Sequence, residues 1–400
     1  MSGLKPGVHR TFGRRRLPGS FLRDTLTAYA FIGPSAIILG VFGLFPVFFT
    51  LFVSLFRWRL ARGPFSGLNN YITLFGGNPA SLAGLAASIG GLILAFVLLR
   101  AGQESGSRAK AFGGAGLLAI SLCSFAIVLP FVASRGDREV FDALRVTAWY
   151  CLLTVPPQIA AGLLLAVLLT RPMRGKQAFR VISLLPYIAP TVATAAVFEL
   201  IFSLRPDSFA NQAAGILGVA PLQWLQEPTG IVALLLGQPL PGNAAGAVAA
   251  YWGEWARGPS LALVSIVFYS WWVFVGYYAL VYINGLGAIP RQLYEAAEVD
   301  GAGPARRFFS ITLPLLSPTT YFLSLLGVIG TFKAFTHLYV LRSPAASGTV
   351  DPISVTIFFT AFRKGNLGYA STIAVLLFVI VLGLTVVQQR TAGRGVTYGD

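Results

Sequence analysis

Charged residues are scarce in this 400-residue chain. Asp, Glu, Lys and Arg together make up 11% of it, and hydrophobic residues make up 55%. A soluble domain is usually about a quarter charged, so this composition predicts that lipid covers most of the surface. The formal charge of +16 would suit nucleic acid. The basic residues, however, lie mostly in short segments between apolar runs, where they orient membrane spans, and we expect no nucleic-acid partner.

Residues suited to catalysis, metal binding or phosphate binding are also few. The two cysteines, Cys123 and Cys151, lie in apolar runs, which excludes a disulfide scaffold and a cysteine-based metal site. The two histidines, His9 and His337, are far apart in sequence, and the HExxH and GxSxG patterns are absent. Gly175-Lys176-Gln177 lacks the final Ser or Thr of a phosphate-binding loop. We therefore expect no catalytic residue, no metal and no cofactor in this chain.

Long apolar runs are what the chain does have. A helix needs about 20 apolar residues to cross the hydrocarbon core of a bilayer, and eight segments qualify. They are Leu26–Phe56, Leu82–Leu99, Ala111–Ala133, Val146–Thr170, Val181–Phe202, Leu261–Ile283, Leu315–Val340 and Tyr369–Gln388. The predicted fold class is all-α, a polytopic transmembrane helix bundle of about eight spans. The first run is longer than the apolar part of a signal peptide, and we interpret it as a retained anchor.

Basic residues predict the orientation. If the amino-terminal tail is cytoplasmic, the inner segments hold 18 Lys and Arg and the outer segments hold 11, as the positive-inside rule requires. Both termini are then cytoplasmic. This assigns residues 1–25 to a basic tail, 26–140 to three spans, 141–390 to a core of five spans, and 391–400 to a second tail. Within the core, residues 205–257 form an extracytoplasmic loop with some structure of its own, and residues 286–314 form a cytoplasmic loop.

Prolines interrupt or border several predicted spans. Proline removes a helical hydrogen bond and kinks the chain, and membrane proteins tolerate such breaks where neighbours or a cavity satisfy the freed carbonyls. These residues are Pro156, Pro157, Pro186, Pro190, Pro314 and Pro318. They fit a bundle that moves or encloses a path, and equally a bundle with static kinks.

The segment from Ile289 to Leu316 has the most specific pattern in the chain. Pro290 suits the first turn of a helix, Gly301 ends that helix, and Pro304 starts a second one. The pattern predicts a helix–turn–helix along the cytoplasmic membrane surface, with a thin, alanine-containing face that another protein can approach closely. An ordinary interfacial amphipathic helix is the alternative interpretation.

This segment resembles the EAA loop of binding-protein-dependent ABC importer permeases. The matching residues are Glu295-Ala296-Ala297, Gly301 and Ile311-Thr312-Leu313-Pro314. In that family the first short helix of the loop inserts into a groove on a cytoplasmic ATPase subunit and transmits its closure to the spans. The resemblance implies this ATPase-coupling role for Tyr294, Glu295, Ala296, Ala297, Asp300 and Gly301.

The resemblance covers Phe141 to Arg390 and the first span, and is closest to the larger permease of maltose-type and glycerol-phosphate-type importers. It implies a type I ABC importer permease core in the inner cell membrane and a transporter subunit rather than an enzyme. The implied partners are a second permease, two ATPase subunits that bind ATP and Mg, an extracytoplasmic solute-binding protein and a sugar-like substrate.

Two departures from the family pattern leave the identity of the substrate open. Leu341-Arg342-Ser343-Pro344 stands in place of a Thr-Gly-Gly-Pro run, and Thr336 in place of an Asp.

A path for sugars needs aromatic faces and a few convergent hydrogen-bonding groups. Tyr277 and Tyr278 lie in the middle of the sixth span, and Tyr277 aligns with a substrate-contacting tyrosine of the maltose-type permease. Gly327 and Gly330 thin the seventh span. The maltose-type chain has a polar sugar-binding residue near Gly330, which implies a different ligand here or that Thr331 takes over. These five residues are the predicted substrate path, with close helix packing as the alternative role of both glycines.

Two ionisable residues lie within predicted spans, Glu199 and Lys333. A charge at the bilayer centre is disfavoured by on the order of 3 kcal/mol, so such residues are functional candidates. Both lie near a predicted outer end, where their side chains can reach the interface instead. An ion-coupled secondary transporter is the second hypothesis for the chain. It would show inverted repeats and a buried acid near the midplane, and the sequence contains neither.

Overall fold

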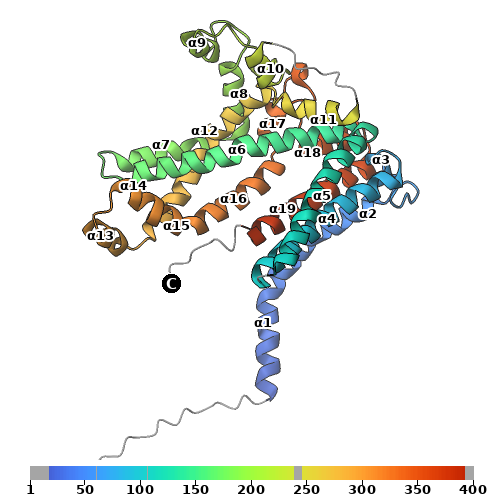
Figure 1. Cartoon of the computed structure of the whole chain (residues 1–400), viewed down its shortest axis with the longest axis horizontal. Helices are drawn as coiled ribbons and strands as arrows, with labels where there is room; N and C mark the ends of the chain where they lie inside the picture. The colour runs from blue at the N-terminus through green and yellow to red at the C-terminus, as the bar shows by residue number, and fades with distance from the viewer. Residues whose placement is uncertain (1–17, 60, 106, 238–245, 392–400) are drawn as a thin grey trace, which may run out of the picture. The chain divides into compact units, whose positions relative to one another are not determined.

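The computed structural model describes residues 18–59, 61–105, 107–237 and 246–391 (Figure 1). Most of the two predicted tails, residues 1–17 and 392–400, lies outside the described residues, as does the proline-containing segment 238–245. The chain divides into two units, Met1–Phe52 and Val53–Asp400, and each is described by itself.

The described part of the first unit is one long apolar helix. It consists of α1 (Pro18–Ile38), the π-helical η1 (Leu39–Leu44) and α2 (Phe45–Ser54), whose last two residues belong to the second unit. Together they give an apolar helix over Thr25–Ser54 that is long enough to cross a membrane. The predicted first span, Leu26–Phe56, therefore differs from the helix only at its ends.

The second unit is also helical. Apart from isolated bridges between Phe56 and Phe65 and between Gly230 and Ser260, its described residues contain only helices and loops. Its long helices are α4 (Pro79–Ser105), α5 (Arg108–Arg135), α6 (Arg138–Thr170), α7 (Lys176–Ile188), α8 (Thr191–Ile201), α12 (Leu261–Gly287), α16 (Ser317–Phe332) and α19 (Leu367–Thr391). The short elements are α3 (Asn69–Leu74), α9 (Phe209–Ile216), η2 (Trp224–Gln226), α10 (Ile231–Leu236), α11 (Ala247–Ala256), α13 (Arg291–Val299), α14 (Pro304–Arg307), η3 (Phe308–Thr312), α15 (Leu313–Leu315), α17 (Thr336–Val340), η4 (Pro344–Ala346), α18 (Ile353–Phe358) and η5 (Phe359–Arg363).

The predicted number of spans is confirmed. Among the described residues of both units, 7 helices are long and apolar enough to cross a membrane, or up to 8 when a bent pair is included. The spans of the second unit are Ala83–Gly102, Phe112–Arg135, Arg138–Thr170, Leu261–Gly287, Ser317–Val340 and Leu367–Thr391. The all-α fold class follows from these helices.

The fifth predicted span, Val181–Phe202, is not one straight helix. It is divided into α7 and α8, which meet at 95°. Pro190 has no amide hydrogen to continue the helix, and the residue before a proline avoids helical dihedral angles. Ala189 accordingly has an extended backbone with φ −66° and ψ 148°. By contrast, α6 continues through Pro156 and Pro157 without a break, so those two prolines do not divide the fourth span.

The core of the second unit forms around α12. Half of the apolar window of α12 is buried, the largest share among the candidate spans. It packs beside α6 and α7, and α6 also packs beside α16 (Figure 1). Glycine permits the closest of these approaches. A Cβ added at Gly162 on α6 would lie 2.5 Å from the Cβ of Tyr278, and one added at Gly276 on α12 would overlap the carbonyl oxygen of Ser183 on α7.

Replacing Gly276 by alanine is therefore expected to destabilise the bundle. The atom that the new methyl group meets belongs to the backbone, so it cannot rotate away, and overpacking of this kind lowers stability by about 1–3 kcal/mol. Thermal unfolding of the purified protein in detergent measures the loss. Gly287→Ala is the matched control, because an added Cβ there meets nothing within 4 Å on the same helix. Equal melting temperatures for the two variants would contradict the expectation.

Helices α4 and α5 pair mainly with each other, and α5 also packs beside α11 and α6. Ser88 Oγ on α4 and Ser124 Oγ on α5 lie 2.8 Å apart. The indole nitrogen of Trp252 on α11 donates to the Ala126 carbonyl on α5 at 2.9 Å. Glu254 on α11 accepts from Arg145 on α6 at 2.6 Å. The described part of residues 205–257 holds α9, η2, α10 and α11, and α11 contacts both α5 and α6; that this segment is an extracytoplasmic loop stays a prediction.

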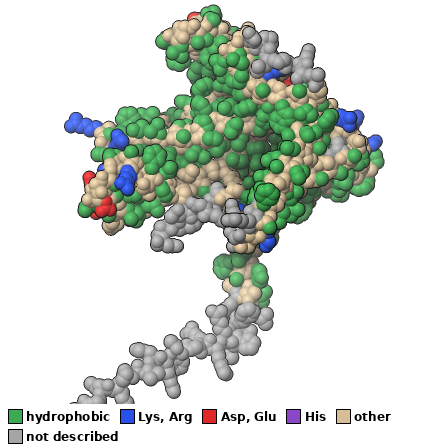
Figure 2. Space-filling view, viewed as in Figure 1, with side chains coloured by type: hydrophobic (Ala, Val, Ile, Leu, Met, Phe, Trp, Pro, Cys, Tyr) green, Lys and Arg blue, Asp and Glu red, His purple; other side chains and the backbone are tan. Residues whose placement is uncertain are grey.

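Charged side chains gather at the α13–α14 end of the face shown in Figure 2, whereas hydrophobic side chains cover the middle of that face. Membrane-spanning helices have the same pattern, with charges confined to the ends.

Candidate functional site

A cavity of about 260 Å³ lies between α6, α7, α8, α12, α16 and α17. All five residues of the predicted substrate path line it: Tyr277 and Tyr278 from α12, and Gly327, Gly330 and Thr331 from α16. The chain therefore brings these residues together in one place, although they come from segments about 50 residues apart.

Helix α6 contributes three polar residues to this cavity that were not among the predicted path residues. Tyr150, Thr154 and Gln158 line it, and all three are buried. Residues four apart share one face of a helix, so the spacing 150, 154, 158 in an otherwise apolar run was a signal that the sequence did contain. The other polar lining residues that were not predicted follow no such period; they are Tyr187 and Thr191 beside the break, and Thr336 and His337 on α17.

Buried hydrogen bonds join three helices at one side of the cavity. The Tyr150 hydroxyl lies 2.7 Å from His337 Nε2 and 2.8 Å from Ser270 Oγ, and Gln158 Nε2 donates to the Ser270 carbonyl at 3.0 Å. Buried polar groups that are bonded in this way fix the side chains that carry them. The network therefore holds α6, α12 and α17 in one arrangement around the cavity.

Aromatic rings form another side of the cavity. The rings of Tyr187 and Tyr277 are stacked with centroids 4.7 Å apart, and Phe274 packs edge-on to Tyr187 at 5.8 Å. Tyr187 lies on the last turn of α7, just before the break at Ala189, so the 95° bend places it here. Rings and hydroxyls arranged like this can bind a solute through its apolar faces and its hydroxyl groups.

The two glycines of the predicted path have different surroundings. A Cβ at Gly327 would lie 2.5 Å from the Tyr278 hydroxyl and 3.0 Å from a methyl group of Val155, whereas a Cβ at Gly330 would meet nothing within 4 Å. Close packing therefore accounts for Gly327. It does not account for Gly330, which faces open space in the cavity.

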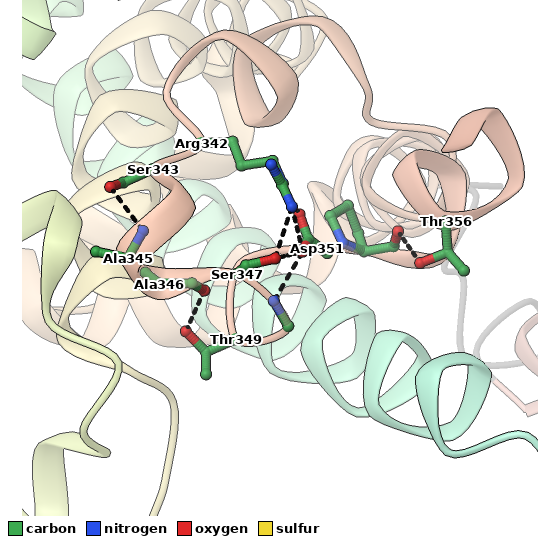
Figure 3. A network of polar contacts seen from close by, with 10 residues as sticks. Arg342, Ser343, Ala345, Ala346, Ser347, Thr349, Asp351 and Thr356 are labelled. Carbon is green, nitrogen blue, oxygen red and sulfur yellow. Dashed lines mark hydrogen bonds and ion pairs between the residues drawn. The ribbon is translucent and has the colours of Figure 1, made fainter. Parts of the chain in front are cut away.

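Helix α17 is held next to the cavity from both of its ends. The Ala334 carbonyl, freed where α16 ends, accepts from Ser354 Oγ at 2.5 Å. After α17, Arg342 Nε donates to Asp351 Oδ1 at 2.5 Å, Arg342 Nη2 donates to Ser347 Oγ at 2.6 Å, and the Gly348 amide donates to Asp351 Oδ2 at 2.7 Å (Figure 3). Arg342 belongs to the run that departs from Thr-Gly-Gly-Pro.

The ionisable residues within spans lie elsewhere. Glu199 on α8 and Lys333 at the end of α16 are exposed, and neither lines the cavity. No three His, Cys, Asp or Glu residues converge to hold a metal ion within the ranges that the structure describes.

The predicted cytoplasmic helix–turn–helix is present as a hairpin of α13 and α14. Helix α13 begins at Arg291, with Pro290 at its N-cap rather than in its first turn. Gly301 has φ +72°, a conformation that favours glycine, and the Ala302 amide donates to the Ala297 carbonyl at 2.8 Å, which closes the helix end. Pro304 begins α14 as predicted.

The residues of the predicted coupling set differ in exposure. Glu295, Ala296, Asp300 and Gly301 are exposed, and Ala297 is half-buried. Tyr294 turns inward, where its hydroxyl lies 2.9 Å from Thr312 Oγ1. Arg307 on α14 forms an ion pair with Glu298 on α13 at 3.1 Å. The hairpin thus presents an open face and is tied to the bundle from its other face.

Proteins of known function have sequences and a fold similar to those of this chain. The trehalose/maltose transport system permease protein MalF of Thermococcus litoralis is 31% identical over 267 residues, which cover 65% of this chain and 79% of that protein. The probable ABC transporter permease protein YurN of Bacillus subtilis is 25% identical over 373 residues, covering 92% of this chain and 96% of that protein. A bacterial ABC transporter involved in the import of the acidic polysaccharide alginate has a chain of the same fold, with a TM-score of 0.53, 21% identity, and coverage of 66% of this chain and 82% of that chain.

The family described as the binding-protein-dependent transport system inner membrane component matches residues 158–392. That range contains the α13–α14 hairpin and most of the helices around the cavity. The resemblance inferred from the hairpin is thereby confirmed. This chain belongs to the family of inner membrane components of binding-protein-dependent transport systems.

Proposed function

We propose that this chain is the permease subunit of an ABC importer that carries an uncharged sugar or sugar-like solute through the membrane. Its family consists of permeases, so the chain is a transporter subunit and not itself an enzyme. The proposal concerns the solute, the route it takes and the partners that drive it.

The lining of the cavity is the observation that carries the proposal. Stacked tyrosine rings, hydroxyls and one amide face a space of about 260 Å³, and among the described residues its lining contains no Lys, Arg, Asp or Glu. A phosphate or carboxylate group would call for Arg or Lys. Sugar hydroxyls and ring faces need only the groups that are there. We assign Tyr277, Tyr278, Gly327, Gly330 and Thr331 to the substrate path on this basis.

The lining also argues against an ion-coupled secondary transporter. Such a protein binds its coupling ion through acidic residues or carbonyls near the midplane, and this cavity has no carboxylate among its described lining residues. Glu199 and Lys333 are exposed near span ends, where their side chains can reach the interface.

The α13–α14 hairpin supports the proposal for the energy source. We assign the ATPase-coupling role to Tyr294, Glu295, Ala296, Ala297, Asp300 and Gly301. In this arrangement two ATPase subunits bind ATP and Mg, a second permease completes the path, and an extracytoplasmic binding protein delivers the solute. Residues 141–390 form the permease core, both termini face the cytoplasm, and the complex lies in the inner cell membrane.

Reconstituted transport tests the proposal. The complete complex, with its ATPases inside proteoliposomes and its binding protein outside, is supplied with radiolabelled maltose, trehalose or glycerol 3-phosphate. We expect uptake of a neutral sugar that requires both internal ATP and the binding protein. Uptake driven by a proton or sodium gradient without ATP would overturn the importer assignment, and uptake of glycerol 3-phosphate alone would overturn the uncharged-sugar assignment.

A further inference from the structure

Three tyrosines tie α12 and α13 to the segment that follows them. On α12, the Tyr278 hydroxyl donates to the Leu323 carbonyl at 3.5 Å, and the Tyr282 hydroxyl donates to Thr320 Oγ1 at 3.0 Å. On α13, the Tyr294 hydroxyl lies 2.9 Å from Thr312 Oγ1. We call these three residues the tyrosine ladder.

The order of the contacts follows the chain. Tyr278 and Tyr282 are four residues apart and share one face of α12. As the tyrosine position rises from 278 through 282 to 294, the partner position falls from 323 through 320 to 312. The ladder is therefore one continuous seam between two antiparallel stretches, α12–α13 on one side and η3–α16 on the other.

Apolar packing fills the seam. Tyr282, Leu316 and Leu323 have no exposed surface, Tyr278 is also buried, and all four belong to one hydrophobic cluster. Tyr294 and Tyr277 pack against the same cluster. A contiguous buried route thus runs from the α13–α14 hairpin to the wall of the cavity.

The two ends of the seam are the two sites described above. Tyr294 lies in the predicted coupling set. Tyr278 lines the cavity and lies over Gly327, where an added Cβ would be 2.5 Å from its hydroxyl. A displacement of α13 that keeps the seam intact must therefore carry along the α12 and α16 walls of the cavity.

We propose that the tyrosine ladder transmits the position of α13 to the cavity, with Tyr294 as its positioning residue. The inference rests on the proposed function, because it needs an ATPase that moves α13. A second polar contact of α13, the ion pair of Glu298 with Arg307 on α14, leaves the Glu298 side chain 70% exposed. Exposed ion pairs contribute little, so the Tyr294–Thr312 bond is the stronger tie.

A thiol placed in the cavity can report on this transmission without any solute. In a Cys123→Ser, Cys151→Ser background, Gly330→Cys introduces a thiol that faces open space. The complete complex with its ATPases is incubated with ATP and vanadate, or with no nucleotide, and the rate of N-ethylmaleimide labelling is measured. We expect the nucleotide to change that rate.

Tyr294→Phe and Thr312→Val each remove one partner of the bond with little change in volume. Each is expected to diminish the nucleotide-dependent change in labelling about fivefold, from the typical strength of one neutral hydrogen bond. The double variant is expected to match either single variant, because only one bond is lost. Co-purification of the ATPase should be unchanged, because both substitutions alter groups that face each other inside the chain, whereas Glu295 and Ala296 form the exposed face of α13. Tyr321→Phe is the control, because the Tyr321 hydroxyl makes no hydrogen bond to any residue that the structure describes.

The outcomes separate the inference from the proposed function. If the nucleotide changes labelling equally with and without Tyr294→Phe, or if the two single effects add, the ladder does not transmit. If Tyr294→Phe abolishes co-purification of the ATPase, Tyr294 is a docking residue, which also overturns the inference. If no ATPase co-purifies with the chain that lacks the Tyr294 and Thr312 substitutions, the proposed function is overturned, whatever the tyrosine ladder does.

Discussion

Glu295→Arg is expected to abolish co-purification of the ATPase and to lower uptake by roughly a hundredfold or more. Glu295 is exposed on α13, and it makes no ion pair with any described residue. The substitution therefore leaves the fold of the chain intact. At an interface, a reversed charge meets like charges or unpaired polar groups, which weakens binding by several kcal/mol, and each 1.4 kcal/mol corresponds to about a tenfold change in affinity.

Affinity purification of a tagged permease, with the ATPase quantified in the eluate, measures the effect. Gln177→Arg is a matched control, because it adds the same side chain at an exposed position on the first turn of α7. A wild-type amount of ATPase with Glu295→Arg would show that the coupling face lies elsewhere. Loss of the ATPase with both variants would show that any added positive charge disrupts the complex.

Gly330→Phe is expected to stop uptake, by roughly a hundredfold or more, while the fold and the ATPase association are retained. An added Cβ at Gly330 meets nothing within 4 Å, so the first side-chain atom has room, and we expect the ring beyond it to extend into the cavity. A phenylalanine side chain occupies a large part of a cavity of about 260 Å³ and removes the space for a sugar. The route then closes for a steric reason that does not involve stability.

Uptake into proteoliposomes, thermal unfolding and ATPase co-purification are measured on the same preparation. Gly383→Phe is the matched control, since an added Cβ there also meets nothing within 4 Å and Gly383 does not line the cavity. Uptake at the wild-type rate with Gly330→Phe would remove this cavity from the path. A loss of uptake with Gly383→Phe as well would point to a general effect of an added ring.

Local patterns were enough to predict most of the fold. Apolar runs of the required length located the spans, since the length of a membrane helix is set by the thickness of the bilayer. Proline and glycine located the start and end of the α13–α14 hairpin, because their backbone preferences act within a few residues. Pro190 predicted a break in the fifth span. The 95° angle between α7 and α8 depends on how each of the two helices packs against the rest of the bundle, so the sequence of either helix alone does not determine it.

The cavity could be predicted only in part. Tyr277 and Tyr278 were found because aromatic residues in mid-span are uncommon, and Gly330 because of a resemblance. The pairing of Tyr150 on α6 with His337 on α17 joins residues 187 positions apart. No local period relates such residues, because contact between them depends on which helices pack together.

The sequence by itself determined that this chain is a membrane-embedded helical bundle and located the hairpin that identifies its family. Both properties arise from composition and from interactions between near neighbours along the chain. The tertiary structure alone decided that six helices surround one cavity whose described lining contains no Lys, Arg, Asp or Glu, and that three tyrosines join this cavity to the hairpin. Those features require side chains from distant segments to meet, and the packing of the helices, with glycine at the closest approaches, determines which of them do.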